Sequence, residues 1–166
     1  MEHHWDEAYG YFGASNDFPE DVESIRFWAK YCNVVDPVLN TNELLGLALR
    51  KGRKAISEAR YRERDEARQE VREAWELVCV GSALHYLNGS LDNMSDDLIR
   101  NHELSEAYAF IKCLFYNPSR QITQSQIDEV LGKIGLNFYD VTTSDLQSAR
   151  DQLAEIYGLE NVKTQL

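Results

Sequence analysis

The chain has 166 residues, 43% of them hydrophobic, which fits one domain of ordinary size with its own core. Its formal net charge of -11 disfavours general binding to nucleic acid or to an anionic membrane, because there is no overall basic field to attract phosphates. Cations and basic partners are favoured instead.

The first predicted element is a helix over residues 2–12, which combines histidines, acids and aromatic residues. In a helix, residues three or four positions apart share a face, so His3 and His4 lie beside Asp6 and Glu7. A His-x-x-Glu pair offers one nitrogen and one oxygen ligand, a set that suits iron, zinc or manganese, although two ligands do not complete a site. The spacing is equally typical of an amphipathic terminal helix whose histidines are exposed or hydrogen-bonded.

Helical periodicity continues through the middle of the chain. Pro19 fits the first turn of a short helix that ends at residues 33–36, ahead of Pro37. From residue 42 to residue 88, apolar residues recur at steps of three and four. The apolar face lapses at residues 63–66, which is typical of a kink, a break or an exposed turn. This pattern predicts two long helices or one bent helix.

Three further helices are predicted, each with a polar residue at its start. Asn88-Gly89-Ser90 ends the long pattern, with Gly89 in the left-handed conformation. The later helices run from Ser95 to Phe115 or Tyr116, from Thr123 or Ser125 to Lys133, and from Thr143 or Ser144 to Tyr157. Strand-like alternation is confined to residues 136–141. The predicted class is all-α, a bundle of five to seven antiparallel helices in a single domain over residues 1–166.

Charge and cysteine patterns exclude several kinds of site. Nine of the 17 lysines and arginines fall between Arg50 and Arg72 with five acids among them, which predicts a salt-bridged helix surface rather than a nucleic-acid patch. Cys32, Cys79 and Cys113 are odd in number and far apart, so they imply no disulfide framework or zinc knuckle and are expected to be buried. No stretch approaches the roughly 20 apolar residues of a membrane span.

A second polar group lies in the helix that begins at Ser95. His102 and Glu106 are four residues apart and share a face. His102-Glu103 matches a His-Glu-x-x-His zinc motif only in its first two letters, because Glu106 stands where the second histidine is needed. Ser105 has no glycine turn beside it that would form an oxyanion hole. Metal binding and a hydrogen-bonded cluster within the bundle are the two interpretations, and a zinc peptidase is disfavoured.

Four segments carry a family resemblance: residues 3–13, 50–56, 75–88 and 102–118. Together they resemble the C-terminal part of an imelysin-related family of bacterial envelope proteins, itself a domain of unknown function. The resemblance implies paired four-helix bundles, export to the periplasm or cell surface, often as a lipoprotein, and association with iron-uptake systems. It also implies that this chain is part of a longer exported protein.

Imelysin-like proteins carry a Gly-x-His-x-x-Glu motif that is proposed to bind metal. The segment from His4 to Glu7 matches its His-x-x-Glu part, whereas Glu2 stands at the glycine position. The name-giving relatives are classed as metallopeptidases, but this chain does not supply the three protein ligands and general base of a zinc hydrolase.

The leading hypothesis is a non-enzymatic, metal-associated helical domain of the bacterial envelope, linked to iron uptake. His4 and Glu7 are its primary ligands for a divalent or ferric ion, iron or zinc. The second-line ligands are His3, Asp6, His102 and Glu106. The alternative is a structural or protein-interaction module without metal, and a metallopeptidase-like hydrolase ranks third.

A homodimer is also expected, because aromatic residues are dense near the start of the chain. They are Trp5, Tyr9, Tyr11, Phe12, Phe27, Trp28 and Tyr31. Burying such side chains is worth roughly 1.5–3 kcal/mol each, and large exposed apolar faces usually bind a partner. Other envelope iron-uptake components are further expected partners. The alternative is a monomer whose terminal helices fold back over the bundle.

Overall fold

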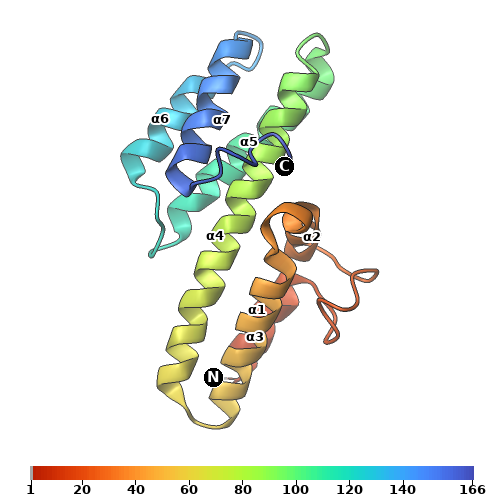
Figure 1. The fold of residues 1–166 in the computed structure, drawn as a ribbon, viewed down its shortest axis with the longest axis vertical. Coiled ribbons are helices and arrows are strands. Elements are labelled where there is room, and N and C mark those ends of the chain that lie inside the picture. The colour runs from red at the N-terminus through yellow and green to blue at the C-terminus, as the bar shows by residue number, and fades with distance from the viewer. Residues whose placement is uncertain (1) are drawn as a thin grey trace. The chain divides into compact units, whose positions relative to one another are not determined.

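The computed structural model describes residues 2–166, which form seven α-helices and one short 3-10 helix, with no strand among these residues (Figure 1). The elements are α1 (Glu2–Phe12), α2 (Trp28–Leu39), α3 (Thr41–Ser57), α4 (Tyr61–Asp92), α5 (Asp97–Cys113), η1 (Leu114–Tyr116), α6 (Gln124–Ile134) and α7 (Thr143–Tyr157). The predicted all-α class is confirmed.

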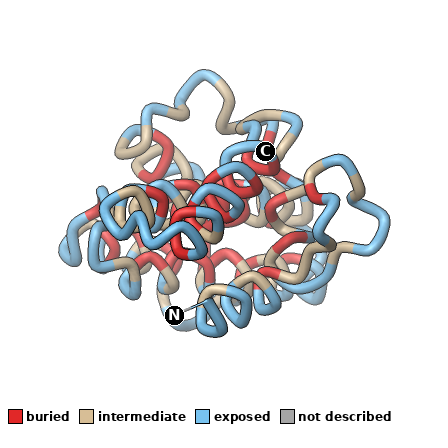
Figure 2. Tube along the Cα trace, turned by 90° about the horizontal axis from the view of Figure 1, so that it is seen from below, coloured by how far each residue is buried: buried red, intermediate tan, exposed pale blue. Residues whose placement is uncertain are grey.

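Two compact units make up the chain, one ending at Val78 and the other beginning at Cys79. The long helix α4 contributes its first part to the first unit and its remainder to the second. Figure 2 shows buried and exposed positions alternating along the helices. This alternation is what amphipathic helices require when one face covers a core.

The core of the first unit is aromatic. Phe12 of α1 is fully buried, and its ring centroid lies 5.2 Å from that of Phe18 and 5.5 Å from that of Trp75. Trp28 of α2 stands 5.4 Å from the same Trp75 ring. These edge-on and tilted arrangements are the favoured geometries of aromatic pairs. Helices α1 and α2 therefore cover one side of the pair formed by α3 and the first part of α4.

Trp5 anchors α1 on α3. Its indole Nε1 donates a hydrogen bond of 3.0 Å to the backbone carbonyl of Leu49. Its ring lies over Gly52, where an added Cβ would overlap the indole. Gly52, in the middle of α3, thus leaves the space that the tryptophan ring occupies. This close approach explains why α3 has a glycine there, although glycine lowers helix propensity.

Most of the aromatic residues that predicted a homodimer pack within the first unit. Phe12 is buried, and Trp5, Tyr9, Trp28 and Tyr31 are partly buried against the core. The remaining two are the largely exposed Tyr11 and Phe27. The exposed aromatic surface is smaller than the sequence indicated, and the homodimer stays a prediction.

The prediction that a helix begins at Pro19 is wrong, because α2 begins only at Trp28. The preceding segment is turned by Asp21, whose carboxylate accepts hydrogen bonds from the Glu23 backbone N–H at 2.9 Å and from a nearby serine hydroxyl. Such Asx turns compete with helix formation. Nor does Pro37 end the helix: it lies inside the last turn of α2, where its missing N–H removes a single backbone bond.

The long apolar pattern forms two helices, one of the two predicted alternatives. The break falls at residues 58–60, with Ala59 in the left-handed conformation at φ 55°, and residues 63–66, where the apolar face lapses, lie within α4. The stop predicted at Gly89 is wrong, because α4 continues to Asp92. An added Cβ on Gly89 would lie 2.6 Å from Glu103 Oε2, so this glycine makes room for a neighbouring side chain instead of ending the helix.

Helix caps in the second unit lie within a residue of the predicted ones. Thr123, one of the two predicted starts, caps α6 in a capping box, whereas Thr142 rather than Thr143 or Ser144 caps α7. Asp96 rather than Ser95 caps α5, with its carboxylate accepting two backbone N–H groups. The segment with strand-like alternation forms turns ahead of α7.

Asn88 of α4 holds the end of the chain in the second unit. Its side-chain Nδ2 donates to the backbone carbonyls of Lys163 at 2.7 Å and Leu166 at 3.0 Å. Its Oδ1 accepts a bond of 3.3 Å from Arg150 of α7. This one amide therefore ties the last residues to two helices.

No helix in the described part of the chain is long and apolar enough to cross a membrane.

Replacing Gly52 by alanine is expected to lower the free energy of unfolding. The new Cβ would displace the Trp5 ring from α3 and break its hydrogen bond to the Leu49 carbonyl. Overpacking of this kind costs roughly 1–3 kcal/mol, more than the gain in helix propensity of about 1 kcal/mol. Gly10→Ala is the matched control, because no atom lies within 4 Å of its added Cβ. Urea unfolding of both variants tests this, and a Gly52→Ala variant as stable as Gly10→Ala would contradict it.

Candidate functional site

The histidine and acid face predicted in the first helix is present on α1. His3 Nε2 lies 3.3 Å from one carboxylate oxygen of Glu7, and His4 Nδ1 lies 3.2 Å from the other. The two imidazole side chains are 79% and 82% exposed. Helical spacing thus brings two imidazoles to a single carboxylate in full contact with solvent.

Asp6 and Glu2 of α1 have a different partner. Arg53 of α3 donates from Nε to Asp6 Oδ1 at 2.6 Å and from Nη1 to Glu2 Oε1 at 3.0 Å. A hydrogen bond from Ser57, followed by the Arg53 charge, lowers the pKa of Glu2. These carboxylates help to hold α1 on α3. Glu7 is left with imidazole partners alone among the described residues.

His102 and Glu106 of α5 form a looser pair. His102 is exposed, and its backbone carbonyl accepts a hydrogen bond of 2.7 Å from Ser105 Oγ. Glu106 is half-buried on the same helix. No hydrogen bond or ion pair joins the two side chains within the described structure, and both the metal site and the hydrogen-bonded cluster stay predictions.

A complete metal site is not formed within residues 2–166, where no three His, Cys, Asp or Glu side chains are arranged to hold an ion. His3 and His4 approach different oxygens of Glu7, so their nitrogens do not converge on one point. Helix α1 offers two ligands, His4 and Glu7. The remaining ligands of an ion bound there would be water or groups of another molecule.

The cysteines add no metal ligand. Cys32 and Cys79 are buried, as predicted, and Cys113 is half-buried. Burial raises the pKa of the Cys32 thiol to about 12. Because the thiolate is the form that binds metals and attacks electrophiles, this side chain acts as a small apolar residue.

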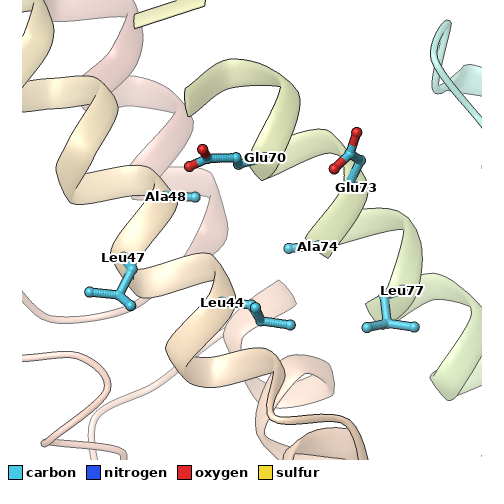
Figure 3. Close-up of a pocket in the computed structure, with 7 residues that line it drawn as sticks. All are labelled: Leu44, Leu47, Ala48, Glu70, Glu73, Ala74 and Leu77. Carbon is cyan, nitrogen blue, oxygen red and sulfur yellow. The ribbon is translucent and has the colours of Figure 1, made fainter. Parts of the chain in front are cut away.

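A groove between α3 and α4 is the feature that sequence reasoning missed. It has a volume of about 390 Å³ and lies within the first unit (Figure 3). Its lining residues are Leu44, Leu47, Ala48, Glu70, Glu73, Ala74 and Leu77. The alanines are buried at its floor, whereas Leu44 is 45% exposed and Leu47 is 52% exposed. Pockets of this size and apolar character are typical of binding sites.

The groove follows from the two apolar stripes of α3. Leu45 and Leu49 face the core that α1 and α2 cover. Leu44 projects about a third of a turn away from that stripe and Leu47 about half a turn, and both remain exposed. The signal was visible in the sequence as three leucines in four residues, more than one covered face requires.

Carboxylates line the α4 side of the groove. Glu70 pairs with Lys51 of α3, and this hydrogen bond raises the pKa of the lysine. Glu73 accepts a hydrogen bond of 2.9 Å from Gln69 Nε2. Among the residues that the structure describes, no lysine or arginine pairs with Glu73. The rim of the groove is therefore acidic.

Comparison with known protein families identifies the chain. A family described as "Domain of unknown function (DUF4856)" matches residues 1–160. The chain belongs to this family. Comparisons with curated proteins and with solved structures gave no match. The narrower likeness to imelysin-related proteins stays an expectation from the sequence.

The thiols of this DUF4856 domain are expected to react in the order of their exposure. Cys113, although burial also raises its pKa, is the half-buried thiol and should be alkylated first in the folded chain. Cys32 and Cys79 should react only after unfolding in urea. Mass spectrometry of peptides from a timed iodoacetamide reaction measures the three rates. Equal rates for Cys32 and Cys113 without denaturant would contradict the packing around α2.

Proposed function

We propose that this DUF4856 domain is a non-catalytic interaction module, which binds a helical segment of a partner protein in the groove between α3 and α4. The exposed leucines of that groove carry the proposal. Leu44 and Leu47 are each about half exposed beside a floor of buried alanines. Covering such side chains removes apolar surface from water at about 25 cal/mol per Å².

The shape of the groove suits a helix. Two antiparallel helices, α3 and the first part of α4, form its walls (Figure 1). Small side chains at Ala48 and Ala74 allow a third backbone to approach closely, and larger ones at Leu44 and Leu77 provide ridges for its side chains. A helix packed between two others is the basic arrangement of a helical bundle.

The chemistry of the groove supports binding rather than catalysis. Its lining residues are leucine, alanine and glutamate, so the described lining supplies no hydroxyl, thiol or imidazole that would act as a nucleophile or be activated by a base. Glu70 and Glu73 are both exposed to water. Exposed carboxylates do not have the shielded setting that general acids need.

A neutral model peptide tests the proposal. We expect an 18-residue helix with leucines at helical spacing and glutamines elsewhere to shift the methyl NMR signals of Leu44, Leu47 and Leu77 in the intact chain. Leu47→Asp should weaken binding at least about tenfold, equivalent to about 1.4 kcal/mol, because it places a charge on the apolar wall. Leu136→Asp is the control, since this leucine is 90% exposed in the second unit.

The outcomes of this titration are distinct. Circular dichroism of each variant checks that the helices are retained, which is expected for substitutions of surface side chains. Saturable binding that depends on Leu47 and not on Leu136 would support the groove. No methyl shift at millimolar peptide, or equal loss in both variants, would contradict it.

A second function, metal association in the bacterial envelope, is favoured by the approach of two imidazoles to Glu7. His4 and Glu7 are the proposed ligands, with His3 in support, and their exposure leaves them free to turn toward an ion. Asp6 is a weaker ligand because Arg53 already neutralises it. Export as a lipoprotein and a link to iron uptake belong to this second proposal.

Calorimetric titration with ferrous, zinc and manganese ions tests the second function. Binding tighter than about 1 mM, the level worth roughly 4 kcal/mol, is expected for at least one ion. His4→Ala should abolish it, whereas His85→Ala, which removes another exposed histidine, should not. Binding that persists unchanged in His4→Ala would exclude α1 as the site.

A further inference from the structure

The groove also specifies the charge of its partner. Resting on the interaction function proposed above, we infer that the occupant is an amphipathic helix with lysine or arginine along one edge. The inference goes beyond apolar contact, because it depends on which charges border the leucines. It follows from the layout of the two helix faces and from the charges on α4.

Acidic residues lie along α4 where an occupant would run. Positions 66, 70, 73 and 77 are spaced by four, three and four residues, so they share one face of the helix. Glutamates occupy the first three of these positions, and Leu77 occupies the fourth. Figure 3 shows Glu70 directed toward α3 above Ala48, and Leu44 directed toward α4. The apolar floor is therefore bordered by carboxylates.

The charge of this border is not balanced by the groove itself. Lys51 of α3 neutralises Glu70 and Arg62 pairs with Glu66 at 3.2 Å, but the described chain provides no cation for Glu73. The segment that forms the groove, residues 41–78, carries 8 acidic and 9 basic side chains, so the unneutralised carboxylate at the rim is a local feature. An incoming lysine or arginine would meet a carboxylate at the rim, whereas an incoming acid would be repelled.

Other occupants fit this surface less well. A second copy of the chain that docked by the same face would bring its own α4 carboxylates toward those of the first, and like charges brought together cost free energy. An anionic lipid surface is repelled by the same groups. A basic amphipathic helix satisfies both features at once, because its leucines cover the floor and its cations face the rim.

The effect of the charges on affinity should be moderate. Exposed ion pairs contribute about 0.2–1 kcal/mol each and like-charge contacts cost a similar amount, so exchanging glutamate for lysine opposite Glu73 corresponds to a change in affinity of up to about tenfold. Salt shortens the range of such attraction, from about 10 Å at 0.1 M to about 3 Å at 1 M ionic strength. A charge preference that results from the rim must therefore fade as salt is added.

Two charged model peptides test the inference on the intact chain. They share the leucine positions of the neutral 18-residue helix, and one carries lysine where the other carries glutamate. Fluorescence anisotropy at low salt should give about tenfold tighter binding for the lysine peptide, and the difference should disappear near 1 M salt. Equal affinity of the two peptides at low salt would overturn the inference but leave the groove proposal standing.

A charge-reversal variant tests whether the preference for the lysine peptide arises at the groove rim. Glu73→Lys should remove or invert the preference for the lysine peptide. Glu155→Lys, which makes the same change in net charge at an exposed site in the second unit, should leave the preference intact. If both variants change it equally, the overall charge rather than the groove rim is responsible, and the inference is overturned.

Two further outcomes identify the other occupants. If none of the three peptides binds, the interaction function itself is contradicted. If the chain alone forms a concentration-dependent dimer that Leu47→Asp dissociates in sedimentation experiments, the occupant is a second copy and the basic-helix inference is overturned. Binding to phosphatidylglycerol vesicles that Leu47→Asp abolishes would overturn it in favour of a lipid surface.

Discussion

The packing of Trp5 against Gly52 of α3 is the constraint on which the first unit depends. The indole can reach the Leu49 carbonyl only because Gly52 has no side chain beneath it. Once α1 is held there, Phe12 enters the core against Trp75, and the opposite face of α1 is left to water. The histidines and Glu7 occupy that outer face. Their exposure is therefore a consequence of how the tryptophan packs, and it gives the face freedom to bind a ligand without disturbing the core.

The same packing leaves the groove open. A pair of helices has two broad sides, and α1 with α2 covers one side of α3 and α4. The other side carries Leu44 and Leu47, and no described element of the first unit covers them. Side chains that remain half exposed contribute only part of their possible burial to folding. Their apolar character is thus better matched to the bound state than to the stability of the free chain.

Local features were predictable from the sequence, and features that depend on distant residues were not. The shared face of His3, His4 and Glu7 follows from helical spacing alone, and the residue type of Thr123 marks it as one of two possible starts of α6. The link between Asp6 and Arg53 joins residues 47 positions apart, and no spacing rule predicts it. Gly89 was assigned to a helix end by its residue type, yet it lies inside α4, where an added Cβ would lie 2.6 Å from Glu103 Oε2 of another helix.

The groove was missed for a related reason. Periodicity indicates how many apolar positions a helix has but not which of them the fold covers, and α3 has enough for more than one stripe. An uncovered stripe carries a risk, because exposed apolar surface promotes unspecific association. Acidic residues beside the leucines reduce that risk by repelling other copies of an acidic chain, while leaving the surface accessible to a helix of opposite charge. The glutamates at the rim of α4 can thus serve both solubility and selectivity, since one electrostatic field opposes self-association and favours a basic partner.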